Sequence, residues 1–238
     1  MSDTHKDIRN EVNLLESEIW DIAHRVWELN ELSLEEEKSS ALEAKYLAEN
    51  GFVISDCGIG GLDYAWIATW GNGKPVIGIT AEFDALPGLG NEAVADKVPR
   101  KDGNPNGHGC GHNLIGAGAI CAAIALKNHL EKNAINATIK VFGCPAEEVI
   151  TGKNFMAMAG AFNDLDACLH WHPANLTTTF NAQTPAIANT RVEFFGKSSH
   201  SGMAPWLGRS ASHATEIFLH GVNAMRKQLL SESRVHYL

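Results

Sequence analysis

The chain has 238 residues, of which 45% are hydrophobic and 20% are charged, and its net charge is −9. This composition is typical of a globular protein of one or two domains and excludes a disordered or fibrous chain. The acidic excess argues against a nucleic-acid partner, because a phosphate backbone would be repelled. No uncharged stretch reaches the ~20 apolar residues of a membrane span, and the opening segment MSDTHKDIRNEVNLL is unlike a secretory signal. We therefore expect a cytoplasmic protein that binds neither nucleic acid nor membranes.

The first part of the chain alternates helical and strand patterns. Apolar residues recur every three to four positions over 8–29 and 35–49, and this spacing predicts two helices. Strands are expected at 52–54, 64–69 and 75–81. The last of these is almost wholly apolar, which indicates a strand buried in a sheet.

A long irregular segment follows, over 82–113, and loops of this length inside a domain are usually functional. Beyond it we expect a closely packed helix at 114–130, a strand at 138–143, a helix at 151–159 and a buried strand at 167–169.

The alternation of helices and apolar strands predicts an α/β fold with a mixed, largely parallel central sheet flanked by helices. From about residue 186 the pattern changes to a strand at 186–195 and a helix at 210–229. We expect a first domain over residues 1–185 and the start of a smaller α+β domain over 186–238.

The motif GHGCGHN carries two metal donors two residues apart, Cys110 and His112. A thiolate and an imidazole suit zinc and similar ions, and the glycines allow both side chains to face one point. Taken alone, the motif fits equally well a glycine-rich helix entry with an incidental Cys and His. The other cysteines, Cys57, Cys121, Cys144 and Cys168, are interpreted as small buried hydrophobic residues.

Two carboxylates, Glu147 and Glu148, follow the strand at 138–143. In an extended segment they would point to opposite sides, so one could face a metal ion and the other a water molecule bound to it. For the pair alone, an acidic helix start in contact with solvent is the favoured interpretation.

Further donors follow other strands. His170 and His172 come after 167–169, and Asp84 comes after 75–81, where it could bind a metal or support a histidine ligand. Ligands commonly bind at the carboxyl ends of strands in open α/β sheets. The presence of donors after several strands therefore favours a ligand-binding or metal-binding site. His200, in a polar loop after 186–195, looks like a loop residue when taken alone.

Together, several blocks resemble one family. AEFDALPGLG, GHGCGHNLIGAGA, GCPAEE, GKNFMA, LHWHP and GKSSHSGMAPWLGRSA occur in this order. They are similar to the dinuclear metal-dependent amidohydrolases and peptidases related to carboxypeptidase G and aminoacylase, and the resemblance covers about residues 20–238. It implies that residues 1–185 are the N-terminal part of a metal-binding catalytic domain and that 186–238 begin a lid, or dimerisation, domain.

The resemblance also implies roles for individual residues. Glu147 is expected to be the general base that takes a proton from a metal-bound water, His200 to stabilise the oxyanion in a neighbouring subunit, and Asp84 to support a ligand. His172 is expected to be a histidine ligand of the metal, because it falls six residues after Asp166, as in relatives. His170 is the second choice for this ligand. The expected ligands of two divalent ions, zinc or manganese, are Cys110, His112, Glu148 and His172.

The implied activity is hydrolysis of an amide bond in an N-acyl amino acid or small peptide such as p-aminobenzoyl-glutamate, by a homodimer or hetero-oligomer assembled through the lid. Family members continue beyond the lid and add a further histidine ligand. We therefore expect a truncated chain that lacks this ligand, and His236, which lies within the lid, does not replace it. An inactive fragment that binds metal or a partner subunit is the alternative. A metal-free structural protein would require the donor pattern to be coincidental.

Overall fold

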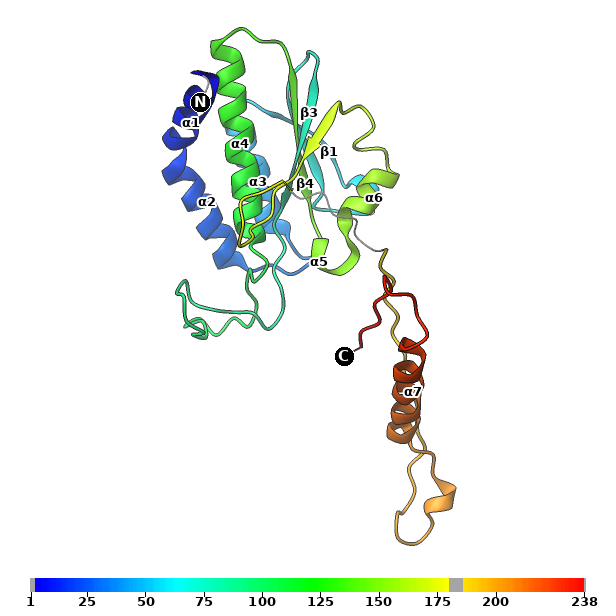
Figure 1. Cartoon of the computed structure of the whole chain (residues 1–238). Helices are drawn as coiled ribbons and strands as arrows, with labels where there is room; N and C mark the ends of the chain where they lie inside the picture. The colour runs from blue at the N-terminus through cyan, green and yellow to red at the C-terminus, as the bar shows by residue number, and fades with distance from the viewer. Residues whose placement is uncertain (1–2, 180–185, 238) are drawn as a thin grey trace. The chain divides into compact units, whose positions relative to one another are not determined.

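A five-stranded mixed β-sheet forms the centre of the first part of the chain in the computed structural model (Figure 1). Across the sheet the strands run in the order β1-β2-β4-β3-β5. β2 pairs antiparallel with β1 and β4, whereas β3 pairs parallel with β4 and β5. The predicted α/β fold with a mixed sheet is therefore confirmed. The strands are β1 (Val53–Cys57), β2 (Trp66–Gly71), β3 (Val76–Glu82), β4 (Thr138–Cys144) and β5 (Ala167–Leu169).

The structure describes residues 3–179 and 186–237, and the chain divides into two units, residues 1–175 and 176–238. The first unit contains the sheet and the helices that cover it. The second unit contains the 3-10 turn η2 (Pro205–Leu207) and the helix α7 (Ala211–Arg226).

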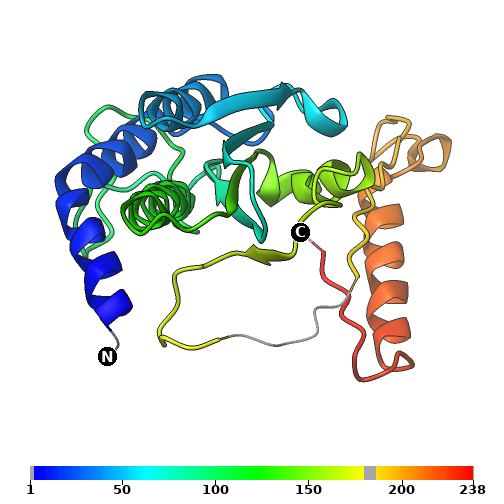
Figure 2. The ribbon, with the colours of Figure 1, turned by 90° about the horizontal axis from the view of Figure 1, so that it is seen from above.

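Four helices lie on the same side of the sheet, as Figures 1 and 2 show; the last two along the chain contact the strands, whereas the first two pack against the fourth. Side chains such as Val26, Ile120 and Ile139 form the main hydrophobic core between these helices and the strands. α4 packs closely on β3, as its run of Gly and Ala residues predicts. The four helices are α1 (Asp3–Leu14), α2 (Glu16–Leu29), α3 (Glu37–Glu49) and α4 (His112–Lys132).

The opposite face carries a smaller core around Phe142, Ile67 and Met156. Alternate residues of β4 supply the two cores, because successive strand side chains point to opposite faces. Three short elements contribute side chains to this second core. They are the 3-10 turn η1 (Ile59–Gly61), the one-turn helix α5 (Glu147–Ile150) and α6 (Gly152–Met158).

Several expectations about individual segments are wrong. The helix predicted over 8–29 is broken at Leu15, and both of its parts, α1 and α2, pack against α4. β5 is exposed rather than buried, because it is an edge strand whose one strand partner among the described residues is β3. Cys168 lies on it and is exposed, as is Cys57 at the end of β1, whereas Cys121 and Cys144 are buried as predicted. No strand forms over 186–195, where the described residues show no ladder partner.

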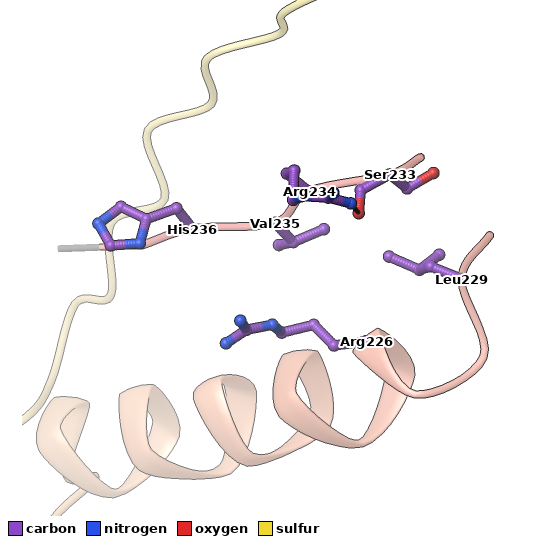
Figure 3. Close-up of a pocket in the computed structure, with 6 residues that line it drawn as sticks. All are labelled: Arg226, Leu229, Ser233, Arg234, Val235 and His236. Atoms are coloured by element: carbon purple, nitrogen blue, oxygen red, sulfur yellow. Dashed lines mark hydrogen bonds between the residues drawn. The ribbon is translucent and has the colours of Figure 1, made fainter. Parts of the chain in front are cut away.

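The second unit contains a short helix with a defined start. Ser210 caps α7, since its side chain accepts a hydrogen bond from the backbone N–H of His213 at 3.1 Å. Beyond α7 the chain turns back and leaves a hollow of about 310 Å³ (Figure 3). Arg234 donates to the carbonyl oxygens of Ser231 and Ser233 there. The hollow is lined by Arg226, Leu229, Ser233, Arg234, Val235 and His236.

Candidate metal centre

The candidate donors lie where three strands end and where α4 begins. β3 is parallel to β4 and β5, so their carboxyl ends meet at one edge of the sheet. Glu82, the last residue of β3, is paired in register with Cys144, the last residue of β4. His112 is the first residue of α4, and the preceding Gly111 has a φ of +82°, a conformation that glycine adopts without a steric penalty. This arrangement gathers donors from four separate segments of the sequence.

His112 is held at the centre of this group by Asp84. Its Nδ1 donates a hydrogen bond to Asp84 Oδ1 at 2.8 Å, and both side chains are buried. Asp84 Oδ2 also accepts hydrogen bonds from Ser33 Oγ at 2.7 Å and from the backbone N–H of Glu148 at 3.0 Å. Burial alone would raise the pKa of Asp84, but these hydrogen bonds hold it below its ordinary value. Asp84 is therefore a carboxylate that orients the His112 imidazole, and its support of a metal ligand stays a prediction.

The other ring nitrogen, His112 Nε2, faces three carboxylates. It lies 3.3 Å from Glu82 Oε2, 3.7 Å from Glu148 Oε1 and 3.8 Å from Glu147 Oε2. His112 Nε2, Glu82 Oε2 and Glu148 Oε1 are all buried and have no hydrogen-bond partner among the described residues. Burial alone would lower the pKa of His112, yet Asp84, Glu82 and Glu148 together raise it. Buried carboxylates destabilise a folded protein unless enough positive charge lies nearby. A bound cation would supply that charge, so these surroundings of His112 Nε2 are suited to one.

A thiol and a second imidazole stand beside His112. Cys110 Sγ lies 3.2 Å from His172 Nε2, and His172 Nδ1 donates to the carbonyl of Pro173 at 2.9 Å. With Nδ1 occupied in this way, Nε2 is the nitrogen left to bind a ligand. Burial, together with the charge of Glu148, raises the pKa of the Cys110 thiol to about 12.

These donors fall into two groups that share His112. Ligand atoms of Cys110, His112 and His172 lie within 4.8 Å of one another, and so do those of His112, Glu147 and Glu148. Thiolate, imidazole and carboxylate donors suit zinc and related divalent ions. The unpartnered buried atoms and the donor chemistry therefore both fit a metal centre.

The local backbone at Glu147 differs from the expectation of an extended segment with the two carboxylates on opposite sides. Instead Glu147 begins the one-turn helix α5, because the preceding Ala146 has the left-handed φ of +56° and turns the chain. Both carboxylates consequently lie on the side of His112. Burial raises the pKa of Glu147, while the nearby Lys153 opposes this effect.

His170 does not join either donor group. Its Nδ1 is 2.8 Å from Thr80 Oγ1, and its Nε2 is 3.7 Å from Glu82 Oε1. Of the two histidines that the sequence left open, His172 is therefore the one that lies with Cys110 and His112.

Two residues near the site were missed by reasoning from the sequence, Glu82 and Lys153. Lys153, on α6, forms an ion pair with Glu82 Oε1. Burial lowers the pKa of Lys153, but the charge of Glu82 outweighs it and raises that pKa. A charged residue at the end of an apolar strand was the available signal for Glu82, and the block GKNFMA, which contains Lys153, was the available signal for Lys153.

His200 belongs to the second unit. Its Nδ1 accepts hydrogen bonds from the backbone N–H groups of Gly202 at 3.2 Å and Met203 at 3.1 Å. These contacts hold the ring within its own loop, and the role expected for it stays a prediction.

Comparison with known proteins identifies the family. A model of the peptidase family M20/M25/M40 matches residues 78–228. The chain belongs to this family. The matched part of this M20 chain includes every donor described above, from Glu82 to His172, and also His200.

Individual relatives agree with this assignment. The M20 chain is 40% identical to the B subunit of p-aminobenzoyl-glutamate hydrolase of Escherichia coli over 91% of its length, and it spans 45% of that relative. It is 33% identical to Xaa-Arg dipeptidase of Mus musculus over 74% of its length, and it spans 39% of that relative. The chain thus spans less than half the length of these two curated relatives.

A solved structure supports the fold. The YxeP protein of Bacillus subtilis, a dinuclear metal binding peptidase of the M20 family, superimposes with a TM-score of 0.51 at 24% identity. The match covers 66% of the M20 chain and 42% of YxeP. Among the described residues, none of the helices combines the length and the apolar character needed to cross a membrane.

Proposed function

We propose that this chain is the metal-binding part of a cytoplasmic enzyme that hydrolyses an amide bond in an N-acyl amino acid or small peptide. The observation that carries the proposal is the convergence of donors from four segments around the unpartnered Nε2 of His112. Membership of the M20 family supports hydrolysis, and the 40% identity to one subunit of p-aminobenzoyl-glutamate hydrolase makes p-aminobenzoyl-glutamate the first substrate to test.

In this proposal the chain binds two divalent ions, zinc or manganese. Their ligands are Cys110, His112, Glu148 and His172, and Glu82 adds a negative charge 3.3 Å from His112 Nε2. When bound, such ions acidify water and polarise the carbonyl that is attacked.

Glu147 is proposed to be the general base. Its carboxylate is half-buried beside His112, and burial raises its pKa, which favours exchange of a proton nearer to neutral pH. Oε2 would take the proton of the attacking water and return it to the leaving nitrogen. Asp84 keeps His112 Nε2 directed at the site through the hydrogen bond at Nδ1.

The second part of the chain is proposed to begin a lid domain over residues 186–238, with 1–185 as part of the catalytic domain. In a homodimer or hetero-oligomer, His200 would reach the site of a neighbouring subunit and stabilise charge on the oxyanion. The Escherichia coli relative is one of the subunits of its enzyme, which supports assembly of this chain with a companion subunit.

The experiment compares the two adjacent glutamates in the 238-residue chain. Metal content and hydrolysis of p-aminobenzoyl-glutamate are measured for the unmodified chain, Glu147→Gln and Glu148→Gln. Glu147→Gln should keep its metal and lose at least about 100-fold in rate, whereas Glu148→Gln should lose metal. A Glu147→Gln variant with nearly normal turnover would contradict the assignment of the base.

Two further outcomes separate the alternatives. Bound metal without turnover in the unmodified chain would favour an inactive fragment that binds metal or a partner subunit. Purified chain that binds no divalent ion would contradict the proposal.

A further inference from the structure

The connection between α2 and α3 reaches the metal centre although none of its residues belongs to a donor group. The backbone N–H of Ala85, just beyond β3, donates to the carbonyl of Glu31 at 2.8 Å, and Leu32 forms an isolated bridge with Ala85. Ser33 donates to Asp84, as described above. The connection therefore lies along the segment that carries Asp84.

Glu36, at the end of this connection, contacts the turn that carries Glu147 and Glu148. Its side chain is fully buried, and Oε1 accepts a hydrogen bond from the backbone N–H of Ala146 at 2.6 Å. Residues 36 and 146 are 110 positions apart, so this contact joins the start of α3 to the end of β4. It adds a side-chain hydrogen bond to the packing of α3 against β4.

Ala146 is the residue at which the backbone needs support. Its φ of +56° and ψ of +41° are left-handed, a conformation in which the Cβ of a residue crowds the following carbonyl oxygen. The turn is closed on the other side by the N–H of Gly152, which donates to the Ala146 carbonyl at 3.1 Å. Glu36 adds to this contact the acceptor for the N–H of the buried Ala146.

Two backbone N–H groups of the turn thus bind two buried carboxylates from different elements. Ala146 N–H binds Glu36, and Glu148 N–H binds Asp84 at 3.0 Å. The two contacts lie on either side of Glu147, so together they set the direction in which both glutamate side chains leave the backbone.

Glu36 is a costly residue for stability alone. Its Oε2 is buried without a hydrogen-bond partner among the described residues, and an unpaired buried polar atom destabilises the folded chain. An apolar side chain would fill the same space without this penalty. What the carboxylate does, and an apolar side chain could not, is accept the hydrogen bond from the Ala146 N–H.

We propose that Glu36 is a positioning residue of the metal centre, which holds the Ala146 amide so that Glu147 and Glu148 face His112. The inference rests on the proposed function, since it assigns Glu36 a role in the geometry of that site. Glu36 does not touch the donor atoms and acts only through the backbone of the turn.

The chain offers a matched control in Glu43. This glutamate lies in the same helix region, is also fully buried, and neither of its carboxylate oxygens has a hydrogen-bond partner among the described residues. Glu36→Leu and Glu43→Leu therefore both remove a buried carboxylate, but only the first removes the acceptor for Ala146. Glu36→Gln keeps an oxygen acceptor and serves as the conservative variant.

The experiment uses the full 238-residue chain with two measurements. Exchange of the Ala146 amide proton is followed by NMR in metal-free protein, and Co²⁺ binding is followed by titration and by the visible absorption spectrum of the bound ion. Glu36→Leu should accelerate the amide exchange and weaken Co²⁺ binding by about 10–100-fold, with a changed spectrum. Glu36→Gln and Glu43→Leu should stay within about threefold of the unmodified chain in affinity, well below the loss expected for a supporting residue.

The proposal would be overturned if Glu36→Leu bound Co²⁺ with unchanged affinity and spectrum, or if Glu43→Leu lost as much affinity. Should Glu36→Leu fail to fold, Glu36→Asp, which keeps the charge but shortens the reach to Ala146, is measured in its place with the same expected losses. Unmodified chain that binds no Co²⁺ would contradict the proposed function instead, and amide exchange would then decide by itself whether Glu36 holds the turn.

Discussion

Asp84 Oδ1 accepts a hydrogen bond from His112 Nδ1 at 2.8 Å, within a pair of side chains that are each no more than 1% exposed. This contact fixes which nitrogen carries the proton, because a carboxylate accepts and Nδ1 must donate. It also leaves His112 Nε2 directed at Glu82, Glu147 and Glu148. The pair therefore decides the direction and the basicity of the central imidazole.

Replacing Asp84 by Asn should weaken divalent metal binding by about 10–100-fold, since the negative partner of His112 is lost. The amide can still accept from one neighbour, so the fold should persist. Isothermal titration with Zn²⁺ checks the affinity, and circular dichroism checks the fold. Ser33→Ala, which removes only one of the donors to Asp84, should have a smaller effect; an equal loss would show that Asp84 acts mainly as a structural residue.

Metal binding should release a proton from Cys110. The pKa of its thiol is raised to about 12 by burial and by Glu148, so the thiol is protonated in the metal-free chain at pH 8, whereas the metal ligand is the thiolate. Titrations at pH 8 in buffers of different ionisation enthalpy measure the protons released. Cys110→Ser should release about one proton fewer than the unmodified chain. An identical release would place Cys110 outside the metal centre.

Gly116 of α4 should not tolerate a side chain. A Cβ at this position would lie 2.0 Å from Glu43 Oε1 and 2.8 Å from the carbonyl oxygen of Glu82. Gly116→Ala should therefore destabilise the chain by about 1–3 kcal/mol in urea unfolding, despite the higher helix propensity of alanine. Gly221→Ala in α7, where a Cβ would meet no atom within 4 Å, is the control and should be neutral or stabilising.

Glu36→Gln should change the pH dependence of stability. Burial raises the pKa of Glu36 from 4.5 to about 7, although its hydrogen bond from Ala146 opposes the shift. The folded chain then binds more protons than the unfolded chain between these pH values, so this group lowers stability as pH rises through that window. Gln does not ionise, and the melting temperature of the variant relative to the unmodified chain should therefore rise from pH 4.5 to pH 7 and level off above it. A constant difference would mean that Glu36 titrates normally.

The sequence predicts most of the strands and helices because their apolar periodicity is strong. It misjudges β5, since three apolar residues look buried whether the strand is central or at the edge, and only the pairing partners decide this. It also misses the break at Leu15, which depends on how α1 and α2 both reach α4.

The donor set is predictable in part because glycine-rich and strand-end motifs mark Cys110, His112 and His172. The backbone of Glu147 is not, since the left-handed Ala146 that turns it is held by Glu36, a residue 110 positions earlier. Glu82 and Lys153 are missed as a pair for a similar reason, because opposite charges 71 positions apart become informative only once the fold brings them together.

The parallel register of β3 and β4 limits where the length of this chain can change. Adding one residue inside β4 would shift Glu147 and Glu148 by about 3.3 Å relative to Asp84 and reverse the faces of the strand's side chains. The exposed residues 93–99, by contrast, lie between Leu86 and Gly107, which form a bridge. Extra residues there do not change the register of β3 and β4. Insertions, whether in natural variants or as tags, should therefore be tolerated over residues 93–99 and should disrupt the fold within β3 or β4.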